Sequence, residues 1–375
     1  MAAQVLESFD FQYERRHNEQ ARRRASSEAI KADLRAIQRF PKLREFRRKN
    51  IAMPKSSSLK TLSGHVEKYG LIGAFVILLL VFNAAAPGRF LTWSNVTSVL
   101  GSQAVLVVLT LSLVITLATD MYDLSAASVL VFSNMLIAVL NVNLGVPIAW
   151  ALAAALVVGV VVGWVNSFFI IRIGINSLIV TLGVGTILNG FTLWISDSQT
   201  ISGISDQLVN FVVVYRLFGI PMEFFYGLIA CIVLWYVMDF TAIGRRLLFV
   251  GRSRQVARLS GIKVERVQRN ALIAAGVLNA FAGILYSGTT GAADPGSGLT
   301  FLLPAMAAAF FGSTSIVPGR FNPWGSLIAV YFLAFGISGV TIQGVQTYVQ
   351  NLFYGGALVI AVTLSQLVKR RKEVG

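Results

Sequence analysis

The chain has 375 residues, of which 55% are hydrophobic and only 13% are charged, and its mean hydropathy is +0.69. These values exclude an ordinary soluble domain and indicate a polytopic helical membrane protein. The formal net charge of +15 is better explained by orientation in a membrane than by nucleic acid as a partner. Cys231, the single cysteine, lies in an apolar run, which excludes disulfides and cysteine-based metal sites.

Residues 1–68 form a basic N-terminal region, which we expect to be cytosolic and partly helical or disordered. Its apolar residues from Glu28 to Phe46 follow a loosely amphipathic helical spacing that suits anionic lipid or a partner. Pro54 and Ser56 to Ser58 are expected to form the linker to the membrane domain. No signal peptide is visible, so the first span should act as an uncleaved signal-anchor.

Ten apolar segments of about membrane-spanning length follow, and they predict an all-α domain over residues 69–368 with a basic cytosolic tail at 369–375. The segments cover residues 70–86, 99–118, 124–141, 147–171, 176–195, 217–238, 270–288, 300–317, 324–342 and 347–367. With both termini inside, only Arg89 and Arg216 of the 32 Lys and Arg residues lie outside, so we expect both termini to be cytoplasmic. The order also allows two inverted five-helix halves, as in many transporters.

A polar break runs from Asp120 to Ser128, between the second and third segments. Charged groups at membrane depth usually face a wet cavity or a partner. A helix that begins near Leu124 would present free N–H groups, which could bind a hydroxylated substrate. The candidates for a translocation path are therefore Asp120, Asp123, Ser125 and Ser128. The alternative is that Asp123 or Ser125 simply caps the helix.

The central loop, Gly244 to Arg269, holds eight basic residues against one acid, Glu265. Its charge predicts a cytoplasmic position, and its middle predicts a short helix from Ser253 to Leu259 that ends at Gly261. Such a helix could receive a push from a cytosolic partner. The alternative is a solvated basic loop that only fixes topology.

Two further loops carry turn-forming residues. Gly312 to Pro323 is expected to be a tight turn on the cytoplasmic side. The external loop from Gly288 to Thr300 is either a docking surface for an external partner or an ordinary loop. The chain has no phosphate-binding loop, zinc motif or nucleophile elbow, so we do not expect an enzyme.

Three of these motifs resemble the membrane-spanning permease of bacterial ABC importers of the ribose/galactose/xylose class, over about residues 70–370. They are the Asp123-Leu124-Ser125-x-x-Ser128 break, the Gly251 to Ile262 region and the Gly312-Ser313-Thr314-Ser315 turn. The resemblance implies that the central loop is a coupling helix that docks on an ATPase subunit, where Arg258 would reach a carboxylate or carbonyl of that subunit. The residues implied in this coupling are Gly251, Arg252, Ala257, Arg258 and Gly261.

The resemblance also implies an inner-membrane permease subunit for a monosaccharide or related polyol. Its expected partners are the lipid bilayer, a second permease copy, an ATPase subunit that binds ATP and Mg, and an extracytoplasmic substrate-binding protein; nucleic acid is not among them. No cofactor is expected in this chain. The alternatives are an ABC permease for branched-chain amino acids, nucleosides or a sugar-like signal, a proton-coupled carrier that uses Asp120 and Asp123, and a membrane scaffold.

Overall fold

A computed structural model of the chain describes residues 57–345 and 348–374, and side chains from residue 68 to residue 365 within them. The chain divides into two compact units, Met1–Leu62 and Ser63–Gly375. The second unit holds the membrane-length helices and is described below. The expectations for residues 1–56, including the helical spacing from Glu28 to Phe46, lie outside the described residues. The expected linker is already helical at Ser57 and Ser58.

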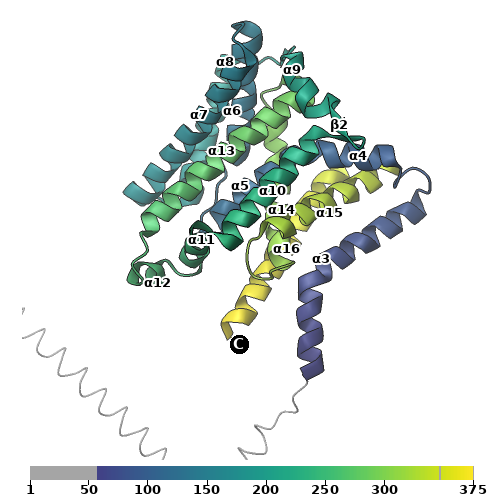
Figure 1. The fold of residues 1–375 in the computed structure, drawn as a ribbon, viewed down its shortest axis with the longest axis vertical. Helices are drawn as coiled ribbons and strands as arrows, with labels where there is room; N and C mark the ends of the chain where they lie inside the picture. Colours follow the sequence, from purple (N-terminus) through teal and green to yellow (C-terminus); the bar gives the residue numbers. More distant parts are fainter. Residues whose placement is uncertain (1–56, 346–347, 375) are drawn as a thin grey trace, which may run out of the picture. The chain divides into compact units, whose positions relative to one another are not determined.

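The described part of the chain is built almost entirely of helices (Figure 1). The first half contains α3 (Ser57–Ala85), α4 (Trp93–Ser102), α5 (Ala104–Leu117), α6 (Ala126–Ala138), α7 (Ile148–Ser167), α8 (Ser177–Ile195) and α9 (Asp206–Val209). The second half contains α10 (Met222–Phe240), α11 (Ala242–Arg252), α12 (Arg254–Leu259), α13 (Val264–Thr290), α14 (Leu302–Thr314), α15 (Pro323–Ile342) and α16 (Tyr348–Val374). Single π-helical turns extend α6, α7 and α9 over Val139–Asn143, Phe168–Ile173 and Asn210–Val214, and a 3-10 turn at Ser297–Phe301 precedes α14.

The strands that the structure describes are two-residue pairs in the loops. β1 (Ile201–Ser202) pairs antiparallel with β4 (Ala292–Ala293), and β2 (Arg216–Leu217) pairs with β3 (Ile220–Pro221).

Nine helices of the described residues are long and apolar enough to cross a membrane, and ten spans result if α4 and α5 are counted as one. This confirms the all-α polytopic prediction. The segment expected at 99–118 is divided, because α4 and α5 meet at an angle of 42° around Gln103. The bend follows the Gly101-Ser102 pair, a common cause of sharp helix kinks.

Two boundaries differ from the sequence expectation. α13 begins at Val264 rather than near residue 270, so the end of the central loop is helical. α16 continues to Val374, so the backbone of the basic tail at 369–375 extends the last helix through that residue. In both places basic residues lower the hydropathy of the segment without ending the helix, because Lys and Arg are good helix formers.

The helix α5 forms the centre of the bundle. Every one of its 14 residues is buried, and it packs against α13, α10, α14 and α15. Apolar residues occupy all faces of α5, as expected for a helix surrounded by other helices.

Glycines allow α7 and α13 to approach closely. A Cβ at Gly159 would lie 2.4 Å from the carbonyl oxygen of Gly276, and a Cβ at Gly163 would lie 2.6 Å from that of Leu272. Only glycine leaves room for backbones at this separation. The four-residue spacing of Gly159 and Gly163 therefore serves helix packing.

The loops gather at two ends of the helices. Figure 1 shows α11 and α12 at one end of α10 and α13, and α9 and β2 at the other. We name the first the central-loop end.

Candidate functional site

The central loop folds into two short helices that lead into α13. The Oγ1 atom of Thr241 accepts the N–H of Gly244 at 3.3 Å, and the Oγ atom of Ser253 accepts the N–H of Val256 at 3.3 Å. These are N-terminal caps of α11 and α12. Gly261 follows α12 with a φ of +79°, the left-handed conformation of a helix stop. The predicted short helix and its glycine terminator are confirmed.

One face of α12 is buried against the rest of the protein, and the other face is exposed. Ala257 is fully buried and packs with Val250 and Val264. On the outer face, Val256 is 49% exposed and Leu259 is 83% exposed. Sequence reasoning missed these two residues, although an apolar pair in a basic loop is a signal for a contact surface.

The arginines of the predicted coupling set differ in their contacts. The guanidinium of Arg258 donates to Oε1 of Glu265 at 2.5 Å, so the carboxylate that Arg258 contacts in the structure belongs to its own chain. Arg252 ends α11 and is exposed.

The central loop touches the first polar break directly. A Cβ at Gly251 would lie 1.9 Å from the carbonyl oxygen of Ala118, so the end of α11 rests on the end of α5. The guanidinium of Arg254 donates to the carbonyl oxygen of Asp120 at 2.7 Å and lies 3.7 Å from its carboxylate. Asp120 itself has a φ of +59°, which is uncommon for a residue other than glycine. The structure thus joins two motifs that are 134 residues apart.

The rest of the break is a buried polar network. The carboxylate of Asp123 accepts the N–H of Ser125 at 3.0 Å, its hydroxyl at 2.6 Å and the amide of Asn279 at 3.3 Å. Ser112 donates to the Oδ1 atom of Asn279, and Asn166 donates to the hydroxyl of Ser125 at 3.0 Å. Sequence reasoning missed the three partners Ser112, Asn166 and Asn279, whose signal is a polar side chain inside an apolar span.

Neither Asp123 nor Ser125 caps α6 in the strict sense, because Ser125 is the N-cap residue and no side chain accepts an N–H of the first turn of α6. The carboxylate of Asp123 holds the turn that precedes α6, and the N–H of Leu124 is bound by the hydroxyl of Thr181 at 3.0 Å. Two N–H groups that were expected to meet a substrate are therefore occupied by side chains. Ser128 is also buried, beside Gly185 of α8. A role of Asp123, Ser125 and Ser128 in the path stays a prediction.

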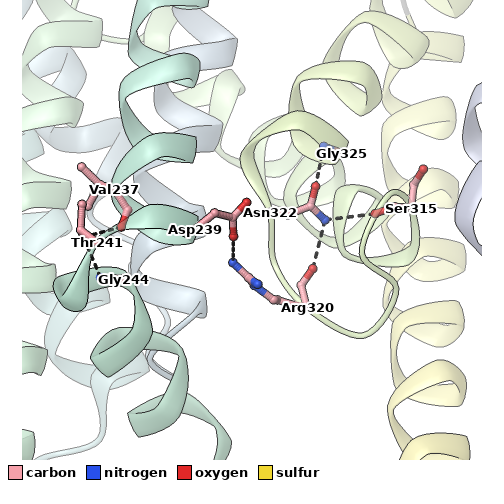
Figure 2. A network of polar contacts seen from close by, with 8 residues as sticks. All are labelled: Val237, Asp239, Thr241, Gly244, Ser315, Arg320, Asn322 and Gly325. Atoms are coloured by element: carbon pink, nitrogen blue, oxygen red, sulfur yellow. Dashed lines mark hydrogen bonds and ion pairs between the residues drawn. The ribbon is translucent and has the colours of Figure 1, made fainter.

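The second break is a rigid turn (Figure 2). The side-chain Nδ2 atom of Asn322 donates to the carbonyl oxygens of Ser315 at 3.0 Å and Arg320 at 3.1 Å, as Figure 2 shows. It also donates to the carbonyl oxygen of Gly312 at 2.9 Å. The Oδ1 atom of Asn322 accepts the N–H of Gly325 at 2.7 Å and caps α15. This agrees with the expected tight turn.

The turn also ties neighbouring helices together. Arg320 forms an ion pair with Asp239 at the end of α10, as Figure 2 shows. Ser315 donates to the carbonyl oxygen of Lys68 at 3.2 Å, and the hydroxyls of Ser313 and Ser365 lie 2.9 Å apart. Thr314 only bonds back to its own helix, at the carbonyl of Phe311. The four predicted residues 312–315 therefore hold α3, α15 and α16 rather than the central loop.

The loop from Gly288 to Thr300, which was expected to be external, is ordered by Asp294. Its carboxylate accepts the N–H groups of Gly296 at 2.9 Å and Ser297 at 2.8 Å, and the hydroxyl of Thr200 at 2.9 Å. These hydrogen bonds stabilise the charged form and lower the pKa of Asp294 below its ordinary value of 3.8. Among the described residues, no cluster of His, Cys, Asp and Glu has the arrangement of a metal site.

Comparison with known proteins gives a consistent result along the membrane domain. Residues 95–362 match the family described as branched-chain amino acid transport system / permease component. The D-allose transport system permease protein AlsC of Escherichia coli is 30% identical over 304 residues, which cover 81% of this chain and 93% of that protein. The ribose import permease protein RbsC of Haemophilus influenzae is 26% identical over 302 residues, 80% of this chain and 93% of the relative.

A third relative is named for a different substrate. The autoinducer 2 import system permease protein LsrD of Photorhabdus laumondii is 28% identical over 302 residues, which cover 79% of this chain and 90% of that protein. No solved structure matches the chain.

Proposed function

The chain belongs to the permease component family of branched-chain amino acid transport systems, and from this premise we propose that it forms the translocation path of an ATP-driven importer for a monosaccharide or related polyol. The observation that carries the substrate class is the 30% identity to the D-allose permease, because it extends over 93% of that protein. The similarity to the ribose permease points to the same class of solute.

The proposed mechanism begins at α12. ATP and Mg bind to a partner ATPase subunit, whose closure pushes on the exposed face formed by Val256 and Leu259. The displacement reaches α5 through the contact of Gly251 with Ala118, and it reaches the first break through Arg254 and Asp120. Because these contacts involve backbone atoms, a displacement of the central loop would move α5 and the first break by a similar distance.

Asp123 acts in this proposal as a positioning residue. Its carboxylate joins the start of α6 to α13 through Ser125 and Asn279. A shift of α5 or α13 would therefore change the position of α6. This change would open the translocation path to one side of the membrane or to the other.

The family match supports an ABC transporter with an ATPase subunit and a binding protein as partners. We propose two permease copies, two ATPase subunits and an extracytoplasmic binding protein in the inner membrane, with both termini cytoplasmic. Impermeant thiol reagents test the sidedness, with cysteines placed at Leu259 and at Phe218 in a Cys231→Ser background, since these side chains are 83% and 82% exposed. We expect only the Phe218→Cys protein to be labelled in intact cells.

Two other functions deserve comparison. The family description names branched-chain amino acids, and this is the second candidate substrate class. A proton-coupled carrier is less well supported, because Asp120 interacts with Arg254 and Asp123 is held by three hydrogen bonds.

Uptake in proteoliposomes tests the proposal. The chain is reconstituted with its partner ATPase and binding protein, after the binding protein has been screened against sugars, polyols and branched-chain amino acids by thermal shift. We expect ATP-dependent sugar uptake that survives a protonophore. Uptake that stops with the protonophore while ATP remains would identify a proton-coupled carrier and contradict the proposal.

A further inference from the structure

A cleft with a volume of about 800 Å³ lies at the central-loop end, between α10, α11 and α13. Its size is that of a small-molecule site. Most of its lining is apolar, with Val233, Leu234 and Val237 on one wall and Leu278 on the other. Val233 and Ile243 are also among the exposed apolar side chains, so the cleft is open at the surface of the bundle.

The mouth of the cleft is positively charged. Arg246 of α11, Lys263 of the preceding turn and Arg266 of α13 line it, and all three are exposed. Among the described residues that line the cleft, none is acidic. The two nearest acids in sequence are engaged elsewhere, since Glu265 binds Arg258 and Asp239 binds Arg320. The mouth therefore offers three positive charges to an anion.

The depth of the cleft matches one leaflet of a bilayer. Along α13, the lining extends from Arg266 to Leu278, a rise of about 18 Å at ~1.5 Å per residue. Half of a hydrocarbon core of ~30 Å is about 15 Å. The charged end thus lies at the level of the headgroups when the apolar wall lies in the acyl region.

From this arrangement we propose that the cleft binds an anionic phospholipid of the leaflet on the central-loop side. Arg246, Lys263 and Arg266 hold its phosphate and headgroup, and one acyl chain lies between α10 and α13. Anionic lipids meet basic pockets between membrane helices by the same combination of charge and apolar contact. The site goes beyond the proposed function and does not depend on the identity of the transported solute.

Native mass spectrometry of the purified full chain tests the site. The detergent-solubilised protein is titrated with phosphatidylglycerol and, separately, with phosphatidylcholine that has the same acyl chains. We expect phosphatidylglycerol to bind at least about tenfold more tightly, since each basic residue near an anionic headgroup contributes roughly fivefold, ~1 kcal/mol. The Arg246→Gln, Lys263→Gln, Arg266→Gln triple variant should lose this preference.

A charge-matched control separates the cleft from the general surface potential. The control triple variant carries Arg172→Gln, Arg245→Gln and Arg269→Gln, three exposed residues outside the lining, and it should keep the preference within about twofold. Equal losses in the two triple variants, or equal binding of the two lipids, would overturn the proposal.

A second variant tests the acyl-chain part. Ala274 is exposed and lines the cleft, so Ala274→Trp should fill it and weaken binding of both lipids. Ala153→Trp, at an exposed position on α7, should leave binding unchanged.

Displacement of the lipid by the bound ATPase subunit would assign the basic residues to that subunit and would overturn the lipid site.

Discussion

Gly251 and Gly261 lie near the two ends of α12, but they are glycines for different physical reasons. A Cβ at Gly251 would lie 1.9 Å from the carbonyl oxygen of Ala118, a clash with backbone that no rotamer relieves. Gly261 has open space around it, and only its φ of +79° requires glycine. The first residue is needed for the contact between the central loop and α5, and the second for the end of α12.

These differences predict unequal effects of substitution. Gly251→Ala should displace α11 from α5, abolish uptake and destabilise the protein by about 1–3 kcal/mol. Gly261→Asn should keep most uptake, because asparagine tolerates the left-handed conformation, whereas Gly261→Val should lose it. Uptake by the three variants is compared at matched protein levels in the membrane, and thermal unfolding is measured on the purified proteins. Full uptake by Gly251→Ala would contradict the proposed transmission path.

The two acids of the first break should also differ. Asp123→Ala leaves the N–H and hydroxyl of Ser125 and the amide of Asn279 without their carboxylate acceptor, at a cost of ~1–3 kcal/mol for each buried group left unpaired. Asp120→Ala removes a carboxylate 3.7 Å from Arg254 but keeps the backbone carbonyl that accepts from it.

We therefore expect Asp123→Ala to lower uptake and the unfolding temperature more than Asp120→Ala does. Asp123→Asn is the matched control, since its amide oxygen can still accept from Ser125. Equal uptake in wild type and Asp123→Ala, at equal protein level, would remove Asp123 from the mechanism.

At the scale of elements, the ion pair of Asp239 and Arg320 joins the end of α10 to the turn between α14 and α15. Both side chains are about one-third exposed, and the buried Nε atom of Arg320 has no hydrogen-bond partner. Asp239→Ala alone should cost about 1–2 kcal/mol of unfolding free energy, because a partly buried guanidinium is left unpaired. The double variant with Arg320→Ala should be more stable than Asp239→Ala alone. Additive losses in this double-mutant cycle would mean that the two residues do not interact.

The external loop should respond to acid through Asp294. Its lowered pKa means that the carboxylate stabilises the loop fully above the ordinary value of 3.8, and that this stabilisation is lost as pH falls through the lower folded-state pKa. The difference in unfolding temperature between wild type and Asp294→Ala should be constant near neutral pH and should shrink below about pH 4. If the difference in unfolding temperature grew on acidification, it would contradict a lowered pKa of Asp294 in the folded protein.

Elements with strong local signals could be predicted from the sequence. The short helix from Ser253 to Leu259, the stop at Gly261 and the apolar length of the spans all have local signals, and each agrees with the structure. The contact of Arg254 with Asp120 could not be predicted, because it joins distant segments through backbone atoms that carry no sequence signal. The partners of Asp123 were missed for a similar reason, since a single Asn or Ser in an apolar span does not reveal which helix it faces.

At the scale of the whole molecule, the resemblance expected from three short motifs is confirmed by the family match over residues 95–362. The three motifs differ in what they contact. The Gly312 to Ser315 turn binds α3 and α16, and the central loop binds the first break. The central loop also offers two exposed apolar side chains, Val256 and Leu259, at the outer face of α12. We therefore propose α12 as the place where the ATPase acts.

Photo-crosslinking from Leu259 tests this claim most directly. A benzoylphenylalanine replaces Leu259, which is 83% exposed on α12, and in a second protein it replaces Phe218, which is 82% exposed in the loop between β2 and β3. Both proteins are irradiated in the assembled complex with the ATPase subunit. The account predicts an adduct with the ATPase from position 259 and none from position 218. An ATPase adduct from position 218, or an intact complex that gives none from position 259, would contradict it.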